Sequence, residues 1–231
     1  MVSPRVSDTQ RQMDTTADRS TVTQPGRRAA GEDPAKREQI LDGAKRVFMK
    51  QGFEAASMND ITRAAGVSKG TIYVYFQNKE DLFEDMVERE RSKLTESVRH
   101  VLDANQELEK TLEEFGTLFA THVTNDSTIR AMRMVIAANH RLPKLCRNFF
   151  STSTVNPMSV LQAYLDRQVT AGVLVCDDTA HAARQFMELT TVGLFKPRIF
   201  GVMEEAPLKA TIEKNVASAI RVFTAAYGAR P

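Results

Sequence analysis

The chain has no tryptophan, few cysteines and no long apolar run. Its 231 residues include two cysteines, Cys146 and Cys176, too few for the disulfide framework of a small secreted domain. No apolar stretch approaches the roughly 18 residues that a membrane span requires. The first residues also lack the charged start and apolar run of a signal peptide. These absences predict reduced thiols, no membrane contact and a cytoplasmic location.

Motifs for catalysis, metal binding and nucleotide binding are also missing. The histidines lack the paired spacing of a metal site such as H-E-x-x-H; they are His100, His122, His140 and His181. The chain contains neither a Gly-x-Gly-x-x-Gly motif nor a P-loop. We therefore expect a protein that is not an enzyme and that holds no metal and no cofactor.

Positive charge is concentrated in one part of the chain, although the net charge of the whole is only +2. Residues 35–80 hold eight basic residues against five acidic ones. Residues 81–231 hold 18 basic residues against 19 acidic ones. Within the basic part, no acidic residue occurs between Ile61 and Lys79. A surface of this sign is suited to approach DNA phosphates.

The same basic part has the pattern of a helix-turn-helix. Two short amphipathic segments, Met58–Ala65 and Lys69–Phe76, flank the tight connector Gly66-Val67-Ser68. Ser57 and Ser68 are suitable N-caps for the two predicted helices, and Gly66 permits the left-handed backbone of a sharp helix exit. The second helix has the size that enters a DNA major groove.

The rest of the chain is predicted to be helical. Pro34 suits the first turn of a helix that Gly52 stops, and Asn78-Lys79 opens another helix. Further helical spacing of apolar residues occurs near residues 107–123, 127–139, 155–171, 179–195 and 207–227, with a break expected over 196–207. Residues 1–33 are rich in Ser, Thr, Gln and Arg and read as a disordered extension. Within that extension, Arg27 and Arg28 offer the alternative of an arm in a minor groove.

The segment from Arg37 to Phe83 resembles the TetR family of bacterial transcriptional regulators. The residues that carry the resemblance are Gly52-Phe53, Ala64-Ala65-Gly66-Val67-Ser68, Gly70-Thr71-Ile72-Tyr73, Tyr75-Phe76 and Asn78-Lys79-Glu80-Asp81-Leu82. The C-terminal part resembles the AefR-type branch through Met132–Ala138, Arg141-Leu142-Pro143 and Gly172-Val173-Leu174.

The resemblance implies an all-α fold with two folded domains after the extension at 1–33. Residues 34–82 would form a three-helix helix-turn-helix DNA-binding domain, and residues 83–231 a larger helical domain for effector binding and dimerisation. It also implies a homodimer that represses transcription from a near-palindromic double-stranded operator and is released by a small hydrophobic effector.

Physical chemistry and the resemblance together assign DNA contacts to ten residues. Ser57 and Ser68 cap the two helices, and Asn59 can reach a base edge or a phosphate. Met58 can either contact DNA or belong to the core. Lys69 can contact a guanine or a phosphate, and Gly70 lets the protein backbone approach the DNA closely. The Thr71 methyl group can contact the methyl group of thymine. Tyr73 and Tyr75 can donate to phosphates, although either ring can instead belong to the core. Lys79 is expected to anchor the DNA backbone beyond the helix.

The effector pocket and the dimer interface are predicted from apolar side chains in the C-terminal half. The candidate pocket residues are Phe115, Phe119, His122, Met134, Met158 and Phe186. The candidate interface residues, on the last two helices, are Phe186, Leu189, Ile212, Val216, Ile220 and Phe223. Such stripes also occur in ordinary cores within one chain.

Two alternatives to an effector-released repressor stay open. The first is a DNA-binding regulator with no small-molecule effector, controlled by a protein partner or by its own abundance. The second is a small-molecule carrier whose DNA reader has decayed, which the intact segment from Gly66 to Lys79 argues against.

Overall fold

The structure, a computed structural model, describes residues 33–104, 107–140, 143 and 155–229. The predicted all-α class is confirmed: in these ranges the regular elements are helices, and one isolated antiparallel bridge joins Leu174 to Gly228. The extension with Arg27 and Arg28, and also Cys146, lie outside the described residues. The helices are α1 (Pro34–Ala55), α2 (Met58–Ala65), α3 (Lys69–Tyr75), α4 (Lys79–Leu102), α5 (Leu108–Thr124), α6 (Asp126–Ala138), α8 (Pro157–Thr170), α9 (Thr179–Thr191), α10 (Phe195–Phe200) and α11 (Lys209–Tyr227).

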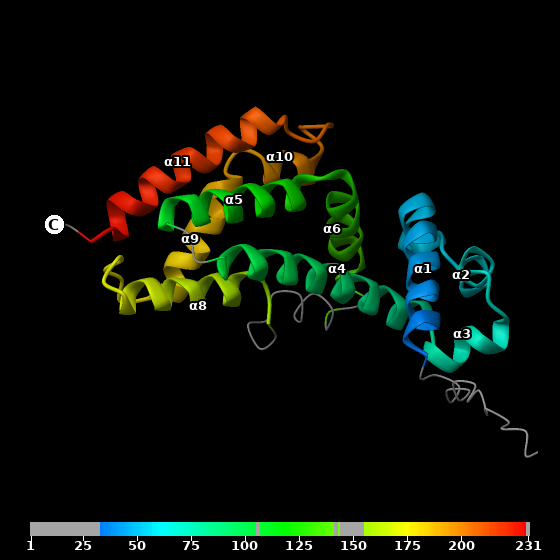
Figure 1. The fold of residues 1–231 in the computed structure, drawn as a ribbon. Coiled ribbons are helices and arrows are strands. Elements are labelled where there is room, and N and C mark those ends of the chain that lie inside the picture. Colours follow the sequence, from blue (N-terminus) through cyan, green and yellow to red (C-terminus); the bar gives the residue numbers. More distant parts are fainter. Residues whose placement is uncertain (1–32, 105–106, 141–142, 144–154, 230–231) are drawn as a thin grey trace, which may run out of the picture.

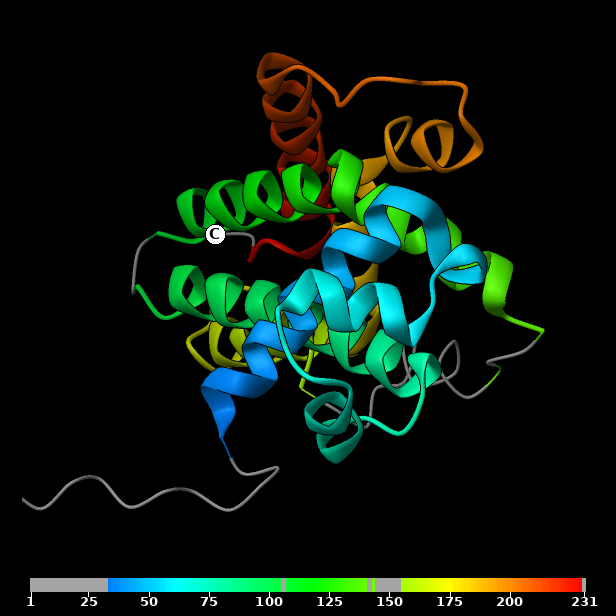
Figure 2. The same ribbon diagram turned by 90° about the vertical axis from the view of Figure 1, so that its right-hand side faces the viewer.

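Two groups of helices lie at opposite ends of the molecule and share the long helix α4 (Figure 1). Helices α1, α2 and α3 form one end, and α5, α8, α9 and α11 pack together at the other. Helix α6 lies between the two groups and contacts α1. Figure 2 views the molecule from the end that carries α1, α2 and α3.

Each group has its own hydrophobic core. The N-terminal cluster consists of buried side chains from α1–α3, the first turns of α4 and the end of α6; its α4 and α6 members are Leu82, Phe83, Met86, Val135 and Ala138. The C-terminal cluster begins on α4 at Leu94 and continues through α5, α8, α9 and α11. Helix α4 therefore contributes to both cores.

Helix α1 follows the sequence prediction at its start and differs at its end. The Asp33 side chain accepts a hydrogen bond from the Ala35 amide, and Pro34 occupies the first turn. Helical geometry breaks at Gly52, where φ is 81°, as predicted. One further turn continues to Ala55 before the chain enters α2.

Ion pairs connect α1 to α4 along their contact. The Arg89 guanidinium, 8% exposed, lies 2.9 Å from both Glu38 and Asp42. Lys45 lies 2.6 Å from Glu90. Burial of Glu90 opposes its ionisation, but the hydrogen bond and charge of Lys45, together with the charges of Lys93 and Arg89, outweigh this effect, so the pKa of Glu90 is lowered. The pairs tie α1 to the first half of α4.

Helix α10 occupies part of the stretch in which the sequence predicted a break. Residues Phe195–Phe200 form a short helix, and Gly201 ends it with a left-handed backbone. The buried Arg198 fixes this helix by donating to the carbonyls of Thr124, Met203 and Glu204 and by pairing with Asp126. A proline is tolerated in the first turn of a helix, so Pro197 does not prevent α10 from forming.

None of the helices in the described ranges combines the length and the hydrophobicity that crossing a membrane requires.

Candidate DNA-binding interface

Local hydrogen bonds fix both helices of the predicted helix-turn-helix. The Ser57 hydroxyl accepts from the Asp60 amide at 3.2 Å and donates to the Asp60 carboxylate, which lowers the pKa of that carboxyl. Ser68 caps α3 by accepting from the Thr71 amide at 3.0 Å. Between the helices, Gly66 has φ 64° and ψ 39°, the left-handed conformation that favours glycine. The predicted caps and turn are therefore confirmed.

Helix α1 holds α2 at close range. An ideal Cβ added to Gly43 would lie 2.6 Å from the Ala65 Cβ, so the two helix backbones cross almost in contact at this point. Gln39 donates to the Ala65 carbonyl at 2.7 Å, and Arg46 donates to the Ala64 carbonyl. These bonds satisfy carbonyls that the end of α2 leaves without helical partners.

Helix α3 turns one face inward and the other face to solvent. Ile72 is fully buried and Phe76, directly after the helix, is 3% exposed, as the spacing predicted. On the outer face, Lys69 and Gly70 are exposed, and Tyr73 is 46% exposed. An outward face of this kind is what groove entry requires.

Val74 also lies on this outer face, with 50% of its surface exposed. The sequence prediction did not include it, although it follows Gly70 by four residues and therefore shares its face. An exposed valine next to Tyr73 is a side chain that can contact a thymine methyl group.

The other candidate DNA contacts differ in how free their polar atoms are. Ser57 and Asn59 are exposed, and Met58 is half-buried against the N-terminal cluster. The Thr71 hydroxyl lies 2.7 Å from the Ser68 hydroxyl and forms a local hydrogen bond with it. The methyl group of Thr71 is the part that is left to contact DNA. The Tyr75 ring packs partly against the N-terminal cluster.

Lys79 is directed toward the protein. Its ammonium donates to the carbonyls of Phe53, Glu54 and Ala56 at 3.0, 3.1 and 3.3 Å. This geometry differs from the phosphate anchor that the sequence predicted.

Family comparisons match both halves of the chain. The family model described as "Bacterial regulatory proteins, tetR family" matches residues 40–86, which span α2, α3 and most of α1. A second model, described as "AefR-like transcriptional repressor, C-terminal domain", matches residues 110–229, more than half of the chain. The chain belongs to the TetR family. The family consists of DNA-binding transcriptional regulators and not of enzymes.

Individual relatives of this TetR-family regulator match over part of the chain. The HTH-type transcriptional regulator AcrR of Shigella flexneri is 40% identical over 70 residues, 30% of this chain and 33% of the relative. The alignments thus span about a third of the length of the first curated relatives.

Solved structures match over nearly their whole length. A TetR-family regulator from Mesorhizobium loti superimposes with a TM-score of 0.78 at 22% identity over 84% of this chain and 97% of that one, which shows the fold. The "Flavonoid-responsive Regulator FrrA" superimposes with a TM-score of 0.67 at 28% identity over 86% of this chain and 100% of that one.

The predicted effector residues of this regulator do not line one cavity. Phe115 and Phe186 are fully buried, with ring centroids 6.2 Å apart, and Phe119 stacks on Phe115 at 6.0 Å. Met158 packs against the same C-terminal cluster. Met134 packs instead against the N-terminal cluster, because α6 turns this side chain toward α1.

His122, on α5, is partly buried and lies close enough to the Lys45–Glu90 ion pair for both charges to act on it. Burial lowers its pKa below the ordinary value of 6.5; the charge of Glu90 opposes this shift, and that of Lys45 adds to it. Its surroundings are therefore the ion pairs between α1 and α4. In the described part of the chain, no three His, Cys, Asp or Glu side chains form a group that could hold a metal ion.

The apolar stripe predicted for the dimer interface faces the chain's own core. Its members on α9 and α11 are at most 9% exposed, apart from the half-buried Leu189; they are Phe186, Ile212, Val216, Ile220 and Phe223. They belong to the C-terminal cluster because, within one chain, α5 covers both helices, α8 covers α9, and α9 and α11 cover each other. The prediction that they form an intermolecular surface is corrected accordingly.

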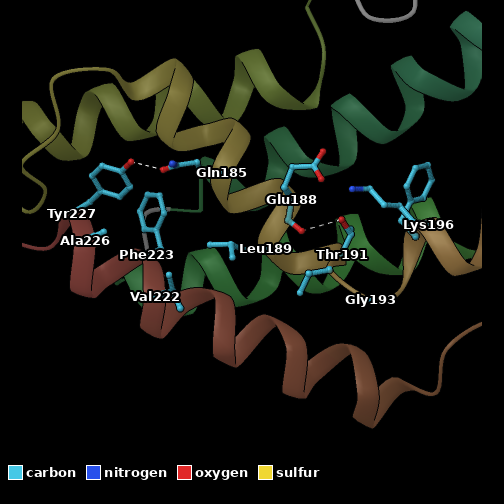
Figure 3. A pocket seen from close by; sticks show the side chains of 12 residues that line it. Gln185, Glu188, Leu189, Thr191, Gly193, Lys196, Val222, Phe223, Ala226 and Tyr227 are labelled. Atoms are coloured by element: carbon cyan, nitrogen blue, oxygen red, sulfur yellow. Dashed lines mark hydrogen bonds between the residues drawn. The ribbon is translucent and has the colours of Figure 1, made fainter.

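A groove of about 530 Å³ opens on the outer side of α9 and α11 (Figure 3). Leu189, Val192, Val222 and Phe223 supply apolar lining, and the Tyr227 hydroxyl hydrogen-bonds to Gln185 at one end. None of the six predicted pocket residues lines this groove.

Proposed function

We propose that this TetR-family regulator is a homodimeric repressor that binds a near-palindromic operator and is released by a small hydrophobic effector. The observation that carries the DNA-binding part is the outer face of α3, where Lys69, Gly70, Tyr73 and Val74 are exposed while Ile72 is buried. The remaining parts rest on family membership and on the surfaces described below.

In the proposed complex, α3 enters the major groove. Lys69, Val74 and the Thr71 methyl group face base edges, and Tyr73 donates to a phosphate. Ser57, Met58 and Asn59, at the start of α2, face the DNA backbone.

Selection of random double-stranded DNA by the purified protein at near-physiological salt tests this assignment. We expect enrichment of a palindrome with half-sites about one helical turn apart. Tyr73→Phe should weaken binding to all sequences by a similar factor, whereas Lys69→Met and Val74→Ala should change the enriched sequence. Absence of any enriched sequence, with the protein folded, would refute the repressor proposal.

Dimerisation is proposed through the outer faces of α9 and α11. One stripe of α11 carries no charge, although Lys214 and Arg221 are exposed beside it; the stripe runs through Thr211, Asn215, Ser218, Val222 and Ala226. The groove beside it exposes Val192 (61%) and Val222 (52%). A two-fold dimer places the same surface of both copies in contact, and desolvation of these valines would stabilise it.

Sedimentation analysis at micromolar concentration tests this interface. Val222→Glu should give a monomer, because it buries a charge in the interface. Val155→Glu, at an equally exposed valine before α8, is the matched control and should leave the dimer intact. A wild-type monomer would contradict the dimer proposal, and a dimeric Val222→Glu variant would place the interface elsewhere.

An effector that enters the C-terminal cluster has to separate packed rings, because Phe115 and Phe186 have no exposed surface. Since FrrA is named as flavonoid-responsive, a flavonoid and other apolar molecules of similar size are suitable first probes. We expect one such apolar probe to lower the DNA affinity and raise the Tm of the free protein. If a broad apolar panel changes neither, the alternative of a regulator without a small-molecule effector is favoured.

A further inference from the structure

The corner between α1 and α2 brings together three backbone carbonyls. After Gly52 breaks the helical geometry of α1, residues 53–55 make one more turn, and Ala56 leads into Ser57, the N-cap of α2. Carbonyls at the end of a helix have no helical partner and require another donor. Those of Phe53, Glu54 and Ala56 all accept from the Lys79 ammonium.

This arrangement uses the full donor capacity of Lys79. A lysine ammonium has three N–H groups, and the three carbonyl oxygens lie 3.0, 3.1 and 3.3 Å from the nitrogen. The nitrogen also lies 4.7 Å from the centroid of the Phe53 ring, within the range of a cation–π interaction. The charge of Lys79 is therefore directed toward the corner between α1 and α2.

Lys79 is also firmly attached at its own end. It is the first residue of α4, directly after the N-cap Asn78, whose side chain accepts from the Asp81 amide at 2.8 Å. The Phe53 ring that it covers packs on Phe83 of α4, with centroids 4.9 Å apart. The side chain thus links the start of α4 to the residue that precedes the α2 cap.

We propose that Lys79 is a positioning residue: it binds no phosphate, and it sets the place of the α2 N-terminus by holding the α1–α2 corner against α4. A phosphate contact would require the ammonium to give up hydrogen bonds to three carbonyls. Ser57 follows Ala56 directly, so movement of the corner moves the residues proposed to face the DNA backbone. The inference rests on the proposed DNA-binding function.

The salt dependence of DNA binding separates a positioning role from a phosphate contact. Each phosphate neutralised by a lysine contributes about −0.9 to the slope of log K against log salt. Binding of a fluorescein-labelled 30-bp duplex, roughly three helical turns, is measured by anisotropy at several salt concentrations. The variants are Lys79→Met, Lys79→Gln and the control Lys69→Met, which removes an exposed lysine from α3.

We expect Lys79→Met to weaken binding about tenfold, as loss of a charge-assisted hydrogen-bond group does, with an unchanged slope. Its Tm should fall, and the amides of residues 57–60 should lose protection from hydrogen exchange in the free protein. Lys69→Met removes an exposed charge from the helix that enters the groove, so it should make the slope less negative and leave the Tm unchanged. Lys79→Gln keeps two N–H donors without the charge, so it should retain more of the Tm than Lys79→Met.

The opposite pattern overturns the inference. A slope that Lys79→Met makes less negative by about 0.9 per protomer, with normal Tm and exchange protection, means that Lys79 meets a phosphate. If Lys79→Met does not fold, Lys79→Gln carries the test: a reduced slope in the folded protein also overturns it. If the wild-type protein binds no DNA, the proposed function fails, while the Tm and exchange measurements still decide whether Lys79 holds the corner.

Discussion

The crossing of α1 and α2 predicts a large effect from the smallest possible side-chain addition, Gly43→Ala. The new Cβ would lie 2.6 Å from the Ala65 Cβ and 2.7 Å from its Cα and amide nitrogen. Carbon atoms pack best at about 3.5–4.0 Å, so the helices must separate by roughly 1 Å. Two of the three opposing atoms are backbone atoms, and no rotamer change can relieve their contact.

The magnitude follows from two opposing contributions. Overpacking of a tight core costs about 1–3 kcal/mol, and contacts of 2.6–2.7 Å that include backbone atoms place Gly43→Ala in the upper part of this range, at about 2–3 kcal/mol. Replacing glycine by alanine inside a helix returns about 1 kcal/mol. We therefore expect Gly43→Ala to lower the free energy of unfolding by about 1–2 kcal/mol. For a chain of this length, this corresponds to a Tm decrease of roughly 2–8 °C.

Thermal and urea unfolding followed by circular dichroism measure this change. Gly70→Ala is the matched control, because its new Cβ would be 3.8 Å from the Ser68 hydroxyl, an ordinary contact, and it should not lower the Tm. If Gly43→Ala is as stable as the wild-type protein or Gly70→Ala, the close crossing of α1 and α2 is refuted.

Three further substitutions test other parts of the molecule. Arg198→Met leaves Asp126 and three carbonyls without their donor, so it should lower the free energy of unfolding, measured in urea, by about 3 kcal/mol. The control Lys196→Met replaces an exposed side chain on the same helix and should leave this free energy almost unchanged. Folding lowers the His122 pKa, so the unfolded chain binds the proton first as the pH falls, and stability that is present above pH 6.5 is lost. His122→Gln should flatten this part of the curve of Tm against pH. A curve that the substitution leaves unchanged contradicts the assignment. Gly66→Ala should lower the Tm through the cost of a left-handed backbone, about 1–2 kcal/mol, while Gly66→Asn should lose less; equal losses would exclude the backbone explanation.

The helix-turn-helix could be predicted in detail because its determinants are local. Ser57 and Ser68 cap the helices within three residues of themselves, and Gly66 forms the turn without distant partners. The periodic placement of Ile72 and Phe76 was sufficient to predict which face of α3 is buried. Sequence patterns therefore predicted both the helix bounds and the outward face.

The features that sequence patterns did not predict depend on distant contacts. A buried stripe within one chain and a stripe between two chains have the same spacing, so Val216 and Phe223 gave no sign that α5 and α9 already cover them. The sequence could not show that the Lys79 ammonium donates to the carbonyls of Phe53, Glu54 and Ala56, because these residues lie more than twenty positions earlier. Helix α10 was missed because Pro197 and Gly201 resemble a break, whereas Arg198 stabilises it through α5 and α6.

The contribution of α6 to the N-terminal cluster has a consequence for biosynthesis. Val135 and Ala138 are 3% and 1% exposed in a core otherwise built from α1–α4. Helices α1–α3 leave the ribosome first, yet the N-terminal cluster is incomplete until α6 has also emerged. A fragment that ends at residue 82 would likewise lack Phe83, Met86 and the α6 side chains. Nascent chains of intermediate length therefore expose an unfinished apolar surface, and they are the forms that a chaperone has to protect.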